Sequence, residues 1–244
     1  MELIPRFFLV SLIFFAAGLV KGVLGMGLPT FAMGLLGLLM PVPQAAGLLT
    51  WPSLVTNVWQ AVVGGAWRAL LARLWPLQVG IVAGVAVAAS LPLQGDEVGR
   101  RLLGACLLAY GVSGLAGWRP LAPAPRVQAM AAPFVGAVTG VITGLTGVFV
   151  LPAVPWLQSL QLDRHQLSQA LGLSFTTSTL ALAGLLAARG QLGWGASLQS
   201  LLVLVPALVG MAVGQKLREG KSEAVFRRCF FGGLVVLGAW LVMR

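Results

Sequence analysis

The segment GLVKGVLGMGLPTF, residues 18–31, places four glycines, one proline and a single lysine inside a long apolar run. The run covers residues 7–40, and a straight helix of that length would measure about 50 Å. The hydrocarbon layer of a membrane is only about 30 Å thick. Glycine and proline in the middle of the run therefore predict that the helix bends or breaks there. A second run of the same kind covers residues 129–160 and contains Pro152.

The composition is that of an integral membrane protein. Hydrophobic residues make up 58% of the 244 positions, charged residues make up 9%, and the mean hydropathy is +0.94. Several apolar stretches of about 18 residues or more are long enough to cross a bilayer as helices, and they lack the alternation of a membrane barrel. We expect an all-α integral membrane protein with further spans near residues 44–65, 74–93, 100–118, 166–187, 196–215 and 225–243.

The net charge of +10 does not indicate a nucleic-acid partner, because the 16 Lys and Arg residues are scattered through short predicted loops. These charges are better explained as groups that orient the protein and contact lipid headgroups. Cys106 and Cys229 stand alone in apolar segments, so we expect them to be core residues and expect no metal site and no cofactor. Residues 1–20 resemble a signal peptide, but the apolar run continues beyond them, and we expect them to be retained.

The chain carries an internal repeat whose short matches keep their order. These matches are GLVKGV (18–23) with GAVTGV (136–141), Ser53 with Ser178, and Gly84 with Gly210. We expect two pseudo-symmetric halves, residues 1–118 and 129–244, joined by a linker at residues 119–128. Each half then consists of one broken segment, which we expect to be re-entrant, and three transmembrane helices.

Whether each broken run crosses the membrane or turns back decides the topology. If the runs cross, the Lys and Arg residues of the loops divide almost evenly between the two sides, seven against eight. If the runs turn back, the halves are inverted and the division is ten against five. The second division agrees better with the excess of positive charge found in cytoplasmic loops. We therefore favour inverted repeats with both termini outside the cytoplasm, and the crossing arrangement stays the alternative.

A break in a membrane helix frees backbone N–H and C=O groups, which survive at that depth only inside protein or along a cavity. Helix N-termini there suit an anion, and transporters built from repeats bind substrate between two such breaks. Lys21 lies in the first break, and Thr139 takes its place in the second. A lysine at membrane depth costs roughly 2.5–3.5 kcal/mol. Its ammonium either binds an anion or, as the alternative, reaches the interface or the carbonyls of a helix end.

The predicted spans contain no carboxylate. All six acids fall in predicted loops or at the terminus: Glu2, Asp96, Glu97, Asp163, Glu219 and Glu223. Carriers of cations and protons usually bury Asp or Glu to bind the ion. An anion is therefore the better substrate.

Polar uncharged residues gather after each break. Hydroxyl and amide groups there can bond the oxygens of an oxyanion, although Ser and Thr also serve close packing between membrane helices. The candidate substrate-binding residues are Lys21, Gly22, Gly25, Gly27, Trp51, Ser53, Asn57, Thr139, Thr143, Thr146, Gly147, Ser174, Thr177 and Ser178.

With these features the chain resembles the TauE/SafE family of anion exporters, in which each half opens with a glycine-rich motif followed by proline. The matching residues are Gly18, Gly22, Gly25 and Gly27 in the first half, and Gly136, Gly140, Gly147 and Pro152, then Ala170, Gly172 and Ser174, in the second. The chain departs from the pattern at Leu28, Pro29, Trp51 and Thr143. The resemblance implies export of sulfite or small organosulfonates such as sulfoacetate across the bacterial cytoplasmic (inner) membrane.

We therefore expect a multi-pass secondary transporter, not an enzyme, that works by alternating access with the anion at a midplane site between the two breaks. An anion channel is the alternative that the glycine-rich breaks also permit. An intramembrane enzyme is disfavoured, because Ser174 has no buried histidine or acid in its surroundings to activate it. The expected partners are a small anionic substrate and the lipid bilayer. A homodimer, the coupling ion and the identity of the anion stay open.

Overall fold

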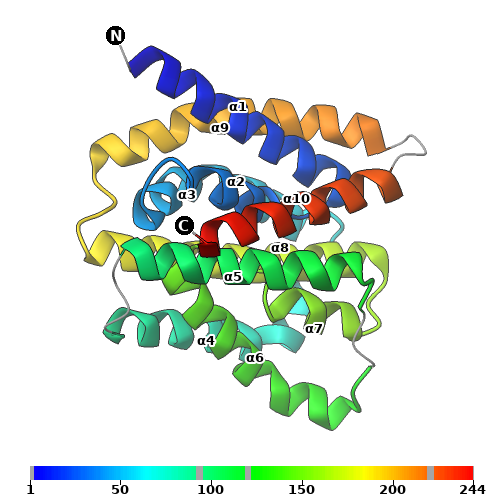
Figure 1. The fold of residues 1–244 in the computed structure, drawn as a ribbon. Helices are drawn as coiled ribbons and strands as arrows, with labels where there is room; N and C mark the ends of the chain where they lie inside the picture. Colours follow the sequence, from blue (N-terminus) through cyan, green and yellow to red (C-terminus); the bar gives the residue numbers. More distant parts are fainter. Residues whose placement is uncertain (1–2, 92–95, 119–121, 219–222, 244) are drawn as a thin grey trace.

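The computed structural model describes residues 3–91, 96–118, 122–218 and 223–243. These residues form ten α-helices and no strand (Figure 1). The helices are α1 (Leu3–Leu24), α2 (Leu28–Leu36), α3 (Val42–Val62), α4 (Trp67–Ser90), α5 (Asp96–Leu115), α6 (Pro125–Thr146), α7 (Ala153–Ser159), α8 (Arg164–Ala188), α9 (Trp194–Arg218) and α10 (Glu223–Met243). The expected all-α fold is confirmed.

Six of the described helices, α1, α4, α6, α8, α9 and α10, are long and apolar enough to cross a membrane. Helices α3 and α5 were also expected to be spans, and their 21 and 20 residues have the length of a crossing. Neither helix is apolar enough to be counted among the six. Helix α3 carries buried polar side chains, and α5 begins with charged residues.

Both long apolar runs break, as their glycines predict. The first run ends its long helix at Leu24, and Gly25 and Gly27 take φ values of 73° and 101°, which favour glycine. Pro29 then stands in the first turn of α2, where a missing N–H breaks no helical bond. The second run breaks in the same way after α6, with Gly147 at a φ of 70°. Each run is thus one long helix followed by one short helix.

Close contacts fix the direction of each packed helix pair. Phe15 of α1 lies against Gly210 of α9 and Leu19 lies against Gly214, so α1 and α9 are parallel. Contacts at two levels give the direction of four further pairs. Helix α4 is parallel to α6 and to α8, and α3 is antiparallel to α8 and α5 to α10: Gly80–Pro133 with Gly84–Ala137, Gln78–Ser174 with Ala89–Arg189, Asn57–Thr179 with Gln60–Ser168, and Gly104–Gly238 with Gly111–Phe231. Helix α3 is parallel to α9, because Leu48 bonds Ser200, and Thr56, two turns later, lines the same pocket as Met211.

The long helices therefore form two sets of opposite direction, α1, α3, α5 and α9 against α4, α6, α8 and α10. The start of α5 lies beside Val42 and its end beside Leu24, which places α5 in the first set. The short helices α2 and α7 return the chain from the end of one long helix to the start of the next. The start of α1 and the end of α10 lie on one side of the bundle (Figure 1).

Two inverted halves would have this arrangement, and the repeat itself stays a prediction. Helix α6 begins at Pro125, so residues 125–128 of the predicted linker are helical, and its residues 119–121 lie outside the described part of the chain. We call the face where α1, α3, α5 and α9 end the basic face, because most of the described Lys and Arg residues near the helix ends gather there: Arg68, Arg73, Arg126, Arg164, Lys216, Arg218, Arg227 and Arg228.

Glycines bring two helix pairs, α1–α9 and α4–α6, into backbone contact. A Cβ atom added to Gly84 would lie 2.0 Å from the carbonyl oxygen of Ala137, and one added to Gly22 would lie 2.3 Å from that of Met211. Such close approach permits the van der Waals packing and Cα–H···O contacts that hold membrane helices together. In Figure 1 these two pairs lie on opposite sides of α3 and α8.

We call the glycine contacts of α1 with α9 and of α4 with α6 the two glycine seams. The backbone contacts of one seam correspond to those of the other. Gly84 of α4 meets Ala137 of α6 just as Gly214 of α9 meets Leu19 of α1. The sequence comparison paired Gly84 with Gly210, one helical turn earlier. Sequence identity around these glycines favours Gly210 as the counterpart of Gly84, whereas the backbone contacts favour Gly214. The matched seams support the predicted duplication.

Gly84→Ala is expected to destabilise the protein by about 1–3 kcal/mol, because the added methyl group overlaps the backbone of α6. Gly232→Ala on α10 is the matched control, since its Cβ meets no atom within 4 Å and alanine favours helix by up to about 1 kcal/mol. Thermal unfolding of both variants in the same detergent measures the difference. Equal midpoints would show that the α4–α6 seam is not tightly packed.

Candidate functional site

Pro52 shapes the middle of α3. Its ring has no N–H, so the carbonyl of Leu48 loses its helical partner. The hydroxyl of Ser200 on α9 donates to that carbonyl oxygen at 2.8 Å and accepts from the backbone N–H of Trp51 at 3.0 Å. Ser200 is completely buried. One side chain therefore satisfies the interrupted backbone and joins α3 to α9.

Lys21 lies in the last turn of α1 and is only 4% exposed. Its ammonium donates to the hydroxyl of Thr56 at 3.1 Å and to the amide oxygen of Asn57, and both residues belong to α3. The amide nitrogen of Asn57 donates to the hydroxyl of Thr179 on α8 at 3.4 Å. A line of polar groups thus joins the first break to the Ser/Thr-rich run of α8. These partners are neutral, so they solvate the positive charge without cancelling it.

A pocket of about 180 Å³ reaches Lys21 from the basic face. Gly22 packs on Met211, which lies seven residues before Arg218 along α9, so Lys21 sits roughly 10 Å inside the end of that helix. The polar side chains of the pocket are Lys21, Thr56, Gln60, His165, Ser168, Gln215 and Arg218. No Asp or Glu stands among the described residues that line this pocket. The lining is therefore positive and neutral.

Gln60 holds the broken end of α1 in place. Its amide nitrogen donates to the carbonyl oxygen of Gly25 at 2.9 Å and to that of Ser168 at 3.1 Å. The first bond satisfies a carbonyl that the break in the run leaves free. Gln60 thereby connects the first break to the start of α8.

Two serines deep in the bundle carry hydroxyls with no hydrogen-bond partner among the described residues. Ser53 on α3 and Ser178 on α8 are each 1% exposed. Ser53 stands one helical turn before Asn57, and Ser178 precedes Thr179 in sequence. Buried polar atoms nearly always have a partner, so these hydroxyls are available to a bound solute.

The threonines of the second break bond their own helix. The hydroxyls of Thr139, Thr143 and Thr146 donate to carbonyl oxygens four residues earlier at 2.7–2.8 Å. Helix α6 does not line the Lys21 pocket, so a shared site between the two breaks stays a prediction. Gly147 instead packs on Met33 of α2, which brings the second break against the first half of the chain.

The remaining candidate residues surround this centre. Gly22 and Gly25 line the Lys21 pocket, whereas Gly27 packs against Phe230 of α10. Ser174 is 1% exposed and accepts a hydrogen bond from Gln78 at 3.4 Å. The others, Trp51 and Thr177, are half-buried on α3 and α8.

Sequence reasoning missed the outer part of the pocket. His165 was not among the candidate residues; it is exposed in the first turn of α8 and lines the pocket. Arg218 and Gln215 stand three residues apart at the end of α9, on one face. Their spacing was the only sequence signal for this part of the pocket. That residues of α8 and α9 line one pocket follows from the folded structure and not from the sequence.

The fold and the site define a multi-pass helical membrane protein with a buried cation in a polar interior. The family model described as sulfite exporter TauE/SafE matches residues 10–241, and the chain belongs to this family of transporters. No curated protein and no solved structure gives a significant match to the chain.

Asn57→Leu is expected to destabilise the protein by about 1–3 kcal/mol, because it removes a hydrogen-bond acceptor from a buried ammonium. Lys21→Met removes the buried charge but leaves the amide oxygen of Asn57 without its donor, so it is expected to cost less than Asn57→Leu. Equilibrium unfolding of both single variants and the double variant in mixed micelles gives the coupling free energy between Lys21 and Asn57. We expect this coupling to be about 1 kcal/mol or more. Additive effects would mean that the bond contributes nothing.

Proposed function

We propose that this protein is a secondary transporter that exports small anions of the sulfite or organosulfonate class across the bacterial inner membrane. The observation that carries the proposal is the buried ammonium of Lys21, which neutral groups solvate at the floor of a pocket whose described lining has no carboxylate. Membership of the sulfite exporter TauE/SafE family supports the substrate class.

The distribution of charge supports an orientation with the basic face in the cytoplasm. Eight described Lys and Arg residues stand near helix ends on that face, against four on the other, Arg6, Arg100, Arg101 and Arg189. Cytoplasmic loops carry the excess of positive charge in membrane proteins. The Lys21 pocket then opens to the cytoplasm, where an exporter collects its substrate.

The outer pocket attracts an anion and the inner pocket binds it. Arg218 lies near the mouth, and its charge raises the local concentration of negative solutes. The hydroxyl of Ser168 and the amide of Gln215 offer hydrogen bonds along the wall. A volume of about 180 Å³ is smaller than the roughly 300–1,000 Å³ of pockets for drug-sized ligands. The pocket therefore suits a small solute.

The path beyond Lys21 follows the antiparallel α3–α8 pair. Ser53 and Ser178 can donate hydrogen bonds to anion oxygens and replace water that the anion loses. A second pocket, of about 90 Å³, lies at the other end of the same helix pair. The first pocket takes α3 residues from Thr56 onward and the second takes α3 residues up to Ala46, which leaves roughly 15 Å of helix between them. Alternating opening of the two pockets would move the anion across.

Lys21→Met is expected to lower sulfite flux by at least about tenfold, because the anion loses its one buried counter-charge on α1. Lys216→Met is the matched control, since Lys216 is exposed on the same face and does not line the pocket. Uptake of labelled sulfite into proteoliposomes, with protein content and unfolding midpoint compared, measures the effect. Unchanged flux in Lys21→Met would assign the lysine to a structural role.

The same assay separates a carrier from a channel. A carrier driven by a gradient accumulates sulfite above the outside concentration and shows counterflow. A channel only equilibrates it. Absence of any protein-dependent sulfite or sulfonate flux in wild-type proteoliposomes would contradict the proposed function.

Ser53→Ala and Ser178→Ala are each expected to raise the half-saturating sulfite concentration by about threefold to tenfold without lowering the unfolding midpoint. Their hydroxyls have no partner to lose among the described residues. Ser174→Ala is the contrasting control, because Ser174 accepts a bond from Gln78, which would be left unpaired. Loss of stability in Ser53→Ala or Ser178→Ala with unchanged affinity would exclude the hydroxyls from the path.

A further inference from the structure

We infer that the pocket at the opposite end of the α3–α8 pair is a low-affinity anion release site, in which Arg189 contacts the anion and Asp96 weakens its binding. The inference rests on the proposed function and concerns the face that the Lys21 pocket does not reach. The ligand is a small oxyanion, the same chemical class that enters on the basic face.

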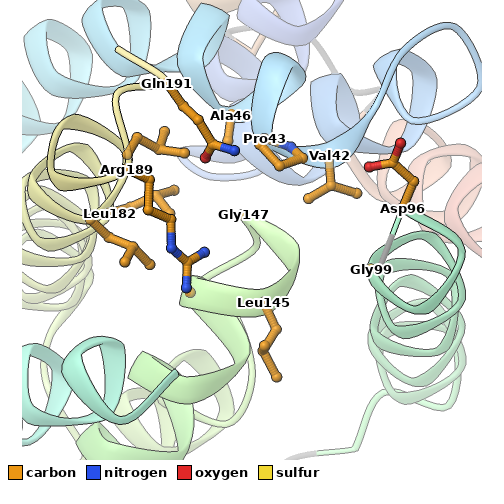
Figure 2. A pocket seen from close by; sticks show the side chains of 13 residues that line it. Val42, Pro43, Ala46, Asp96, Gly99, Leu145, Gly147, Leu182, Arg189 and Gln191 are labelled. Atoms are coloured by element: carbon orange, nitrogen blue, oxygen red, sulfur yellow. The ribbon is translucent and has the colours of Figure 1, made fainter. Parts of the chain in front are cut away.

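The release pocket is built from helix ends that all lie on the face opposite the basic face. It is lined by the start of α3 (Val42, Pro43, Ala46), the end of α6, the end of α8 and the start of α5 (Figure 2). Gly144 and Gly147, at the second break, belong to the lining. The second break thus contributes to this pocket as the first break contributes to the Lys21 pocket.

Arg189 supplies the positive charge of the release pocket. It caps the C-terminus of α8 and is half-buried, and one guanidinium nitrogen donates to the carbonyl oxygen of Ala89 at 3.2 Å. That bond fixes the side chain against the end of α4. A guanidinium has five N–H donors in a planar fork that matches an oxyanion. The amide of Gln191 stands in the same lining and offers a further donor.

Asp96 opposes Arg189 from across the pocket. Figure 2 shows the two side chains coming from opposite sides, Asp96 from the start of α5 and Arg189 from the end of α8. Asp96 is exposed, and it also lines two neighbouring pockets of about 240 and 490 Å³. The carboxylate therefore stands where the three pockets adjoin. An anion in the release pocket has the guanidinium of Arg189 on one side and this carboxylate on the other.

The two pockets therefore treat the same anion differently. The Lys21 pocket combines Lys21 and Arg218 with neutral donors and has no acid in its described lining. The lining of the release pocket contains one carboxylate, that of Asp96, and one guanidinium, that of Arg189. Attraction by the unlike charge of Arg189 is offset by repulsion from the like charge of Asp96. Binding on this face is weaker as a result, which favours release of an anion that has crossed.

The test compares half-saturating sulfite concentrations on the two faces in proteoliposomes of known orientation. Asp96→Asn, which keeps the ability to cap a helix, is expected to lower the value on the release face by about threefold to tenfold. Arg189→Gln is expected to raise it by a similar factor. Both variants should leave the value on the basic face within about twofold, whereas Lys21→Met lowers flux from either face.

Matched controls stand on α5, the helix that begins with Asp96. Glu97→Gln and Arg101→Gln change charge by the same amounts on the same face, but these residues form an exposed ion pair at 2.6 Å and line neither pocket. If the control variants have effects equal to those of Asp96→Asn and Arg189→Gln, the change reflects only the surface potential of this face, and the inference is overturned. Equal changes on both faces, or no change in Asp96→Asn, would also overturn it. Wild-type protein without flux would instead overturn the proposed function, and the inference with it.

Discussion

A positive charge that neutral groups hold inside a membrane bundle is the constraint on which this structure depends. The ammonium of Lys21 has the hydroxyl of Thr56 and the amide oxygen of Asn57 as partners, and Asn57 in turn bonds Thr179 of α8. Solvation of this kind lowers the cost of burial but leaves the field of the charge in place. The polar faces of α3 and α8 follow from that requirement, and so does the affinity for negative solutes that we propose.

The sequence predicted the outline of the fold because its strongest signals are local. Apolar length, glycine and proline located the helices and both breaks to within a few residues, and they required no knowledge of distant contacts. Residue type marked Lys21 as exceptional but left open whether its ammonium binds an anion or reaches the interface or the end of a helix. Bonds such as that between Ser200 and Leu48 join residues 152 positions apart. Such pairings depend on how the helices pack, which a single sequence does not contain.

The register of the repeat shows where local signals stop being sufficient. By sequence, Gly84 corresponds to Gly210 in the predicted repeat, whereas the approach of the backbones matches it with Gly214. The outer pocket has the same difficulty, because His165 and Arg218 stand 53 residues apart along the chain. Thr139 shows a further limit. Its residue type suits a ligand, and a sequence does not disclose that its hydroxyl bonds its own helix at Val135.

The two hydrogen bonds of the Ser200 hydroxyl have a mechanical consequence. They fasten α3 to α9 at the point where proline would otherwise let α3 flex, and the glycine seam already locks α9 to α1. These contacts connect α1, α3 and α9 to one another, and the second seam connects α4 and α6. In the transport cycle that we propose, any movement of one group against the other would fall along α3 and α8, where the facing side chains include small hydroxyl residues.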